Sequence, residues 1–127
     1  MSEAVIDASA LLALLNAEPG SDVVAEALPG GAISTVNLSE VVAKLCEAGM
    51  PENAIHQALQ SLGLEVVPFY EDHAYQAGLL RASTRAAGLS LGDRACLSLA
   101  KRMGIAALTT DRTWEGLSVG ANVRVIR

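Results

Sequence analysis

Four acidic residues of this chain have the type and spacing of a metal site: Asp7, Glu40, Asp93 and Asp111. Each lies where an apolar segment that predicts a strand adjoins a segment that predicts a helix. Carboxylate oxygens without supporting His or Cys ligands suit hard cations such as Mg²⁺ or Mn²⁺. Two carboxylates about 4 Å apart repel by roughly 4 kcal/mol at an effective dielectric of about 20, so four together require protons or a cation. The predicted chemistry is hydrolysis by a metal-activated water.

Helix capping is the simpler explanation for each acid taken alone. Asp7 and Asp111 can act as helix N-caps. Residues 37–40 and 90–93 both have the pattern of a capping box, and Lys44 could pair with the acid one turn before it. Applied to all four acids, capping requires four independent coincidences, whereas one shared site explains the whole set.

The elements that must position these acids alternate between strands and helices. Predicted strands cover residues 5–6, 32–34, 64–67, 106–109 and 123–126. Predicted helices cover residues 10–18, 22–28, 37–48, 71–87 and 92–103, and a further helix begins at Pro51 and ends before Gly63. This alternation predicts an α/β fold, in which a parallel sheet has helices on both faces.

Such a fold would bring the four acids to one edge. In right-handed crossovers a helix runs back antiparallel to its strands, so strand C-termini and helix N-termini share an edge of the sheet. Asp7 and Asp111 end the first and fourth predicted strands. Glu40 and Asp93 lie in the first turns of two predicted helices. We therefore expect all four at the edge where open α/β sheets bind their ligands.

The composition suits one domain, residues 1–127. Hydrophobic residues make up 51% of the chain and aromatic residues only 3%, so the core must consist of Ala, Leu, Val and Ile, as in a covered parallel sheet. No apolar run approaches the roughly 18 residues of a membrane span, and an acid stands where a signal peptide needs positive charge. We therefore expect a cytoplasmic protein. Cys46 and Cys96 lack metal-ligand spacing and are expected to be buried free thiols.

Charge is divided unevenly along the chain, whose net charge is −5. Residues 1–72 hold eleven acids and one base, whereas residues 73–127 hold three acids and eight bases. Either the two halves interleave into a surface that is acidic on average, or an acidic pocket lies beside a basic surface. The sequence leaves both interpretations open.

Four segments resemble the signature motifs of PIN-domain nucleases, most closely those of the VapC toxins of bacterial toxin–antitoxin systems. They are residues 5–11 (VIDASAL), 39–41 (SEV), 89–97 (LSLGDRACL) and 108–114 (LTTDRTW). The resemblance covers essentially the whole chain in the family's order, and the third segment is the most specific. It implies a three-layer PIN-like fold with a parallel sheet of four to five strands, in which the first strand lies between the second and the fourth.

The same resemblance implies a Mg²⁺-dependent endoribonuclease whose acidic quartet corresponds to the four acids named above. Thr109 matches the family's hydroxyl near the last acid, and Ser9 is a second supporting hydroxyl. Asp7 and Asp93 are expected to be the closest metal ligands, with the other two acids acting through water or on a second ion. Attack by water would leave a 5′-phosphate and a 3′-hydroxyl.

Basic residues are expected to contact RNA phosphates. The candidates are Arg81, Arg85, Arg94, Lys101 and Arg112. Each of them, taken alone, could equally belong to a solvated helix face. The scarcity of aromatic residues leaves no stacking platform, so recognition would depend on RNA shape and backbone. The resemblance further implies a homodimer that is blocked by a cognate antitoxin, which inserts an Arg or Lys toward the acidic pocket.

Other protein classes agree less well with the residues. A haloacid-dehalogenase-type phosphatase needs a second Asp two residues after the first, where Ser9 stands. A response-regulator receiver domain needs a paired acid after the first strand and a late Lys after the last one, and neither is present. An RNA-processing PIN nuclease without an antitoxin remains open. A non-catalytic PIN-like binding module also remains open, although a scaffold has no reason to hold four crowded carboxylates.

Overall fold

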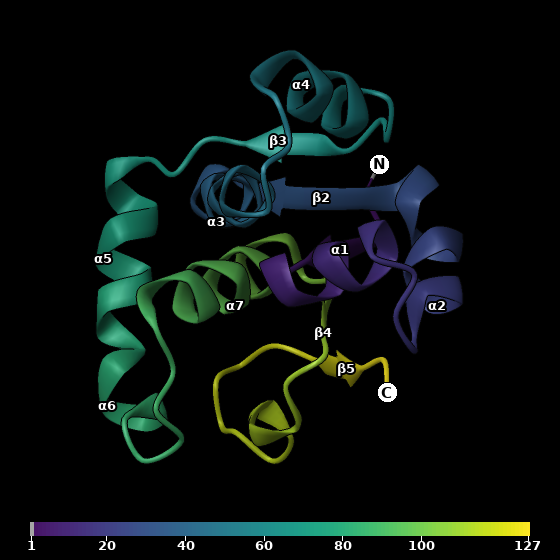
Figure 1. Cartoon of the computed structure of the whole chain (residues 1–127). Helices are drawn as coiled ribbons and strands as arrows, with labels where there is room; N and C mark the ends of the chain where they lie inside the picture. Colours follow the sequence, from purple (N-terminus) through teal and green to yellow (C-terminus); the bar gives the residue numbers. More distant parts are fainter. Residues whose placement is uncertain (1) are drawn as a thin grey trace.

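A five-stranded parallel sheet forms the centre of the computed structural model, which describes residues 2–127 (Figure 1). The strands are β1 (Ala4–Ile6), β2 (Gly31–Ser34), β3 (Glu65–Val67), β4 (Ala106–Thr109) and β5 (Val123–Val125). Their order across the sheet is β3-β2-β1-β4-β5, and each neighbouring pair is parallel. The predicted α/β fold, with the first strand between the second and the fourth, is confirmed.

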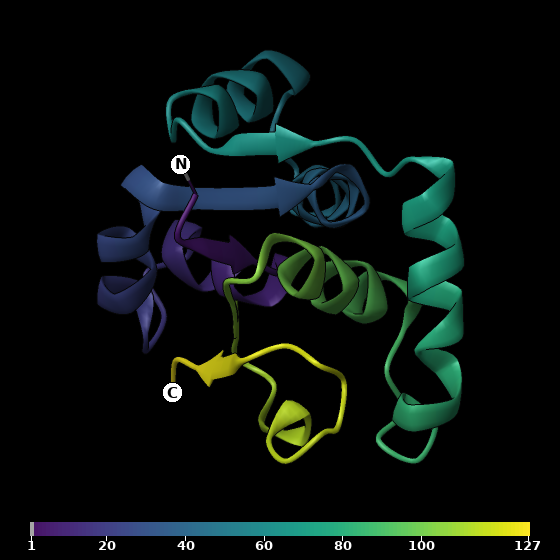
Figure 2. The same ribbon diagram turned by 180° about the vertical axis from the view of Figure 1, so that it is seen from behind.

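Helices cover both faces of this sheet. They are α1 (Ala8–Leu15), α2 (Ser21–Ala27), α3 (Thr35–Glu47), α4 (Glu52–Gln60), α5 (Glu71–Leu79), α6 (Arg81–Thr84) and α7 (Leu91–Met103), with short 3₁₀ turns η1 (Leu28–Gly30) and η2 (Arg112–Trp114). Seen from both sides, α5 runs past α7 at the side of the molecule opposite α2 (Figures 1 and 2). Within residues 2–127 we find no helix with the length and apolar character that crossing a membrane requires.

Alternating side chains of β1 supply two separate cores. Ile6 packs with residues of α1, α2 and α3 in one cluster. Val5 packs on the other face, with Cys96 and Leu97 of α7 and with the fully buried Trp114. The central strand is therefore buried on both faces, as expected for a parallel sheet.

The helix predicted over residues 71–87 is wrong as a single element, because the chain turns at Leu80 and forms α5 and α6 instead. Gly78 weakens the helix just before the turn. The hydroxyls of Ser83 and Thr84 both donate to the Leu80 carbonyl oxygen, at 3.2 Å and 2.8 Å, which favours a local turn over a straight helix. The turn buries Leu80 in the core beside α7.

Three further expectations are corrected around α3. The helix begins at Thr35, with Ser34 as its N-cap, so residues 37–40 lie inside it and do not form a capping box. Lys44 pairs with Glu47 at 3.8 Å on the exposed side of the helix. Cys46 is free, as predicted, but it is exposed on the side of α3 that faces α4, whereas Cys96 is free and buried.

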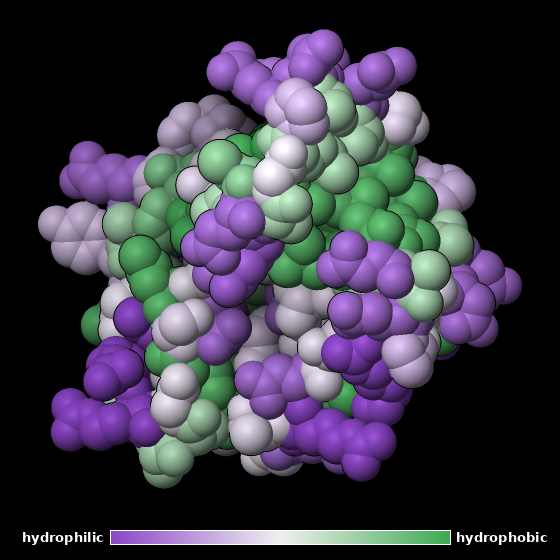
Figure 3. Space-filling model, in the orientation of Figure 1, coloured by the Kyte–Doolittle hydropathy of each residue, from purple (hydrophilic) through white to green (hydrophobic). Residues whose placement is uncertain are grey.

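An apolar groove of about 710 Å³ remains open between α3, α4 and β3. Val42 and Val66 are exposed along it, and Met50 and Leu59 also line it. In the space-filling view, hydrophobic surface gathers beneath α4, on the side of α1 and α2 (Figure 3). None of the four acids lines this groove.

Candidate acidic site at the carboxyl edge of the sheet

Asp7 lies at the centre of the candidate site, directly after β1, and only 3% of its surface is exposed. Its backbone is extended and its Oδ1 accepts a hydrogen bond of 2.8 Å from the amide of Ala10, so it is the N-cap of α1. The predicted capping role is confirmed. Capping and a position at the sheet edge arise together, because a cap residue between a strand and a helix must stand where the strand ends.

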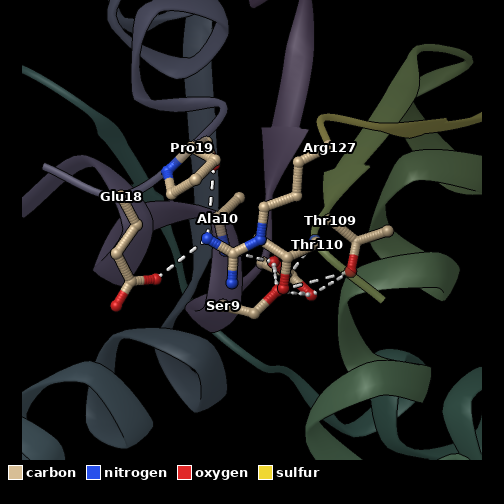
Figure 4. Close-up of polar contacts among 8 residues, drawn as sticks. Ser9, Ala10, Glu18, Pro19, Thr109, Thr110 and Arg127 are labelled. Atoms are coloured by element: carbon tan, nitrogen blue, oxygen red, sulfur yellow. Dashed lines mark hydrogen bonds and ion pairs between the residues drawn. The ribbon is translucent and has the colours of Figure 1, made fainter. Parts of the chain in front are cut away.

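The hydroxyl groups of Ser9 and Thr109, which lie close together (Figure 4), hold the Asp7 carboxylate in place. The Thr109 hydroxyl donates to Oδ2 at 2.7 Å, and the Ser9 hydroxyl lies 2.8 Å from Oδ1 and 3.0 Å from Oδ2. Each hydroxyl also accepts a backbone hydrogen bond of 3.0 Å: Ser9 from Thr110, and Thr109 from Asp111. The end of β4 is thereby fixed against the end of β1.

Burial raises the pKa of Asp7 from its usual 3.8 to about 6, and the neighbouring charge of Asp93 adds to the rise. The hydrogen bonds from Ala10, Thr109 and Ser9 oppose it, because they favour the charged form. Asp7 is therefore ionised at neutral pH, but at an energetic cost that a nearby cation would relieve.

Glu40 approaches the site from the first half of α3. The side-chain amide of Asn37, one turn earlier, donates 2.9 Å hydrogen bonds to Glu40 Oε1 and to the carbonyl oxygen of Gly92 in α7. A Cβ atom on Gly92 would overlap both carboxylate oxygens of Glu40. The Glu40 carboxylate therefore lies over the backbone of α7, beside Asp93, in space that only a glycine leaves free.

Asp93 and Asp111 both cap helical turns. Asp93 forms the predicted capping box, in which its Oδ2 accepts from the Ser90 amide at 2.9 Å and the Ser90 hydroxyl accepts from the Asp93 amide at 3.2 Å. Asp111 is the N-cap of η2, and its Oδ1 accepts from the amide and the hydroxyl of Thr113. The carboxylate of Asp111 is thus turned into its own loop, and its backbone amide connects it to Asp7 through Thr109.

The thiol of Cys96, buried beneath the site, is close enough to sense three of the acids. Its pKa is raised first by burial and then by the negative charges of Asp7, Asp93 and Glu40. Three of the four predicted residues therefore lie near one buried thiol, and Asp111 is connected to Asp7 through the Thr109 hydroxyl.

The donor set agrees in kind with a hard divalent cation, because it consists of oxygens alone. Within residues 2–127, the structure places no three His, Cys, Asp or Glu side chains close enough together to hold a metal ion. At least one oxygen of each of the four carboxylates accepts a hydrogen bond from within the chain. The absent side chain at Gly92 provides the space that the Glu40 carboxylate occupies.

The basic residues proposed for RNA contact are scattered. Arg94 packs against α5, where its Nη1 donates to the Ala77 carbonyl oxygen at 3.0 Å. Lys101 lies two turns further along α7, roughly 12 Å from Asp93 by the rise of a helix. Arg81 and Arg85 are exposed at α6. Two of the five candidates immediately follow an acid of the site: Arg94 after Asp93, and Arg112, in η2, after Asp111.

Two residues at this edge were not singled out as site residues by the sequence. Asn37 has no motif of its own, although its position one turn before Glu40 is a signal that could have identified it. Arg127 follows β5, so it lies at the same edge of the sheet. Its Nη1 donates to Glu18 Oε1 at 3.0 Å (Figure 4). Its carbonyl oxygen accepts from Arg112 Nε at 3.1 Å.

Comparisons with known proteins support the same fold. The family model described as PIN domain matches residues 4–118. A search of the curated proteins finds no match. A toxin–antitoxin complex from Klebsiella pneumoniae is 20% identical, with a TM-score of 0.76 over 98% of both chains. DNA-bound VapBC from Salmonella typhimurium is 18% identical, with a TM-score of 0.75 over 98% of both chains. VapBC2 from Rickettsia felis, bound to a promoter DNA fragment, is 16% identical, with a TM-score of 0.74 over 95% of this chain and 96% of that one.

Proposed function

Since this chain belongs to the PIN-domain family, we propose that it is a Mg²⁺-dependent endoribonuclease and the toxin component of a type II toxin–antitoxin system. The acidic site at the carboxyl edge of the sheet would hydrolyse RNA phosphodiester bonds. The observation that carries this proposal is a concentration of negative charge without an internal cation. The negative charges of Asp7, Asp93 and Glu40 all act on the same buried thiol and raise its pKa. None of the four acids forms an ion pair within residues 2–127.

Asp7 and Asp93 would be the closest ligands of the cation, with Glu40 and Asp111 acting through water or on a second ion. Mg²⁺ or Mn²⁺, when bound, lowers the pKa of a coordinated water and stabilises negative charge on the attacked phosphate. Thr109 and Ser9 orient Asp7, since each hydroxyl is fixed in turn by a backbone amide. Arg112, next to Asp111, would contact a phosphate of the RNA.

A cognate antitoxin and a homodimeric state complete the proposal. The similar structures named above include toxin–antitoxin complexes, which supports a protein partner for this chain. The uncompensated carboxylates would favour a partner that brings an Arg or Lys side chain to the site in place of the metal. Expression of the protein alone should therefore slow the growth of its host, and a folded, metal-binding protein that is harmless would favour an RNA-processing nuclease instead.

Cleavage of total RNA by the purified protein tests the activity directly. The wild type should cleave in Mg²⁺ and not in EDTA, and Asp93→Asn should be inactive while still able to accept the capping hydrogen bond from Ser90. Asp22→Asn, at an exposed acid in the first turn of α2, is the matched control and should retain full activity. Cleavage that survives EDTA, or equal cleavage by Asp93→Asn, would reject the metal-site proposal.

A further inference from the structure

Asn37 is a buried polar residue between two parts of the acidic site, with 1% of its surface exposed. Its amide nitrogen donates to Glu40 Oε1 and to the Gly92 carbonyl oxygen, both at 2.9 Å. A carboxylate and a carbonyl oxygen can only accept hydrogen bonds, so the nitrogen and not the oxygen of the amide must face them. The orientation of the Asn37 side chain is therefore set by its partners.

The other end of the same amide has no partner. Oδ1 of Asn37 is buried, and no hydrogen-bond donor within residues 2–127 reaches it. A buried, unsatisfied oxygen costs about 1–3 kcal/mol. A leucine of the same branched shape would avoid this cost, so packing alone does not explain an asparagine at this position. The two hydrogen bonds that Nδ2 donates compensate for the unsatisfied Oδ1.

We propose that Asn37 is a positioning residue, which holds the Glu40 carboxylate over the backbone of Gly92 and beside Asp93. The inference rests on the proposed function, because it assigns Asn37 to the same metal-dependent reaction. Asn37 acts through Glu40. The bond to the Gly92 carbonyl anchors the amide to α7, and the bond to Oε1 then selects one placement of a carboxylate that is otherwise exposed to solvent.

The glycine at position 92 completes this arrangement. Its missing side chain leaves the space that the Glu40 oxygens occupy, and Asn37 keeps them there. Residues that orient a metal ligand without touching the metal typically account for about 10–100-fold in metal affinity or activity. A residue that merely joined α3 to α7 would change stability without acting specifically through Glu40.

A double-mutant cycle separates these two roles. The variants are Asn37→Leu, Glu40→Ala and the double variant, and the measurements are RNA cleavage, Mg²⁺ affinity by calorimetry and the melting temperature. Leucine keeps the branched shape and removes both hydrogen-bonding ends. We expect Asn37→Leu to melt at or above the wild-type temperature and to lose about 10–100-fold in cleavage and Mg²⁺ affinity. In the Glu40→Ala background, Asn37→Leu should alter RNA cleavage and Mg²⁺ affinity by less than about threefold.

Equal losses in both backgrounds, or no loss with Glu40 present, would overturn the proposal. If Asn37→Leu does not fold, Asn37→Ala removes the amide without adding apolar atoms, and the same comparison applies. Thr84→Ala is the matched control, because it removes a buried polar group from α6 whose hydroxyl bonds only the Leu80 carbonyl oxygen. It should lower the melting temperature and leave cleavage by the folded protein unchanged.

One measurement needs neither metal nor RNA, so it distinguishes failure of this inference from failure of the proposed function. In the metal-free wild type, the two side-chain amide protons of Asn37 should give separate, exchange-protected NMR signals. Glu40→Ala should shift at least one of them strongly. Unchanged signals would overturn the positioning role even if the protein cleaves RNA. A clear shift in a protein that neither binds Mg²⁺ nor cleaves RNA would reject the proposed function and leave the hydrogen bond as a purely structural one.

Discussion

Replacing Asp7 with asparagine should stabilise the metal-free protein at neutral pH, because it removes a buried charge and keeps the helix cap. Asn caps a helix about as well as Asp, so its oxygen can accept the hydrogen bond that Ala10 now donates to Oδ1. The Thr109 hydroxyl, which donates to Oδ2 in the wild type, can rotate and accept from the new amide. The change therefore isolates the effect of the charge.

The magnitude follows from the pKa of Asp7. A rise from 3.8 to about 6 on folding corresponds to about 3 kcal/mol, at 1.36 kcal/mol for each pKa unit. Because the pKa is higher in the folded protein, ionised Asp7 destabilises the fold above pH 6, and this penalty disappears as the pH falls toward 3.8. The variant should therefore be more stable by about 1–3 kcal/mol at pH 7.5, and its advantage should vanish near pH 4.

Unfolding by urea and by heat, in EDTA and in excess Mg²⁺, measures this difference. A gain of 1 kcal/mol raises the melting temperature by roughly 3–5 °C in a domain of this size. Mg²⁺ at about 100 times its Kd would stabilise the wild type by about 2.7 kcal/mol, so the advantage of the variant should shrink or reverse. Asp22→Asn, at an exposed position, should change stability by less than about 0.5 kcal/mol under all conditions. A variant less stable than the wild type at pH 7.5, or equal Mg²⁺-induced shifts in both proteins, would refute the reasoning.

Two further substitutions test the surroundings of the site. Gly92→Ala should leave the melting temperature unchanged or raise it, because Ala favours a helix by about 1 kcal/mol over Gly. RNA cleavage should nevertheless fall at least about tenfold, since the new Cβ displaces the Glu40 carboxylate. Full cleavage by Gly92→Ala would show that the placement of Glu40 is unimportant. Thr109→Val should destabilise the protein at pH 7.5 by about 1–3 kcal/mol in urea unfolding, because Asp7 loses its 2.7 Å hydrogen bond. Thr109→Ser keeps the hydroxyl and should lose less stability. Equal losses in the two Thr109 variants would mean that packing, and not the hydroxyl, stabilises this position.

The order of the elements and the edge shared by the acids could be predicted from the sequence. Apolar runs, glycine stops and cap residues are local signals, and the handedness of crossovers then places Asp7, Glu40, Asp93 and Asp111 at one edge. The local signals failed where contacts distant in sequence decided the outcome. The burial of Leu80 against α7 divides the helix predicted over residues 71–87, and no periodicity within that segment encodes its partner.

Only the tertiary structure decided how the acids are held and how much free energy it costs to ionise them there. The pKa of Asp7 depends on its burial and on hydroxyls of which one, Thr109, is 102 residues away in the sequence. The place of Glu40 depends on Asn37 and on the empty space at Gly92, which come from different helices. A sequence pattern states which residues can ionise or donate. Whether a carboxylate is buried, and which donor faces it, depends on distances in space, because desolvation and hydrogen bonding act over a few ångströms whatever the separation along the chain.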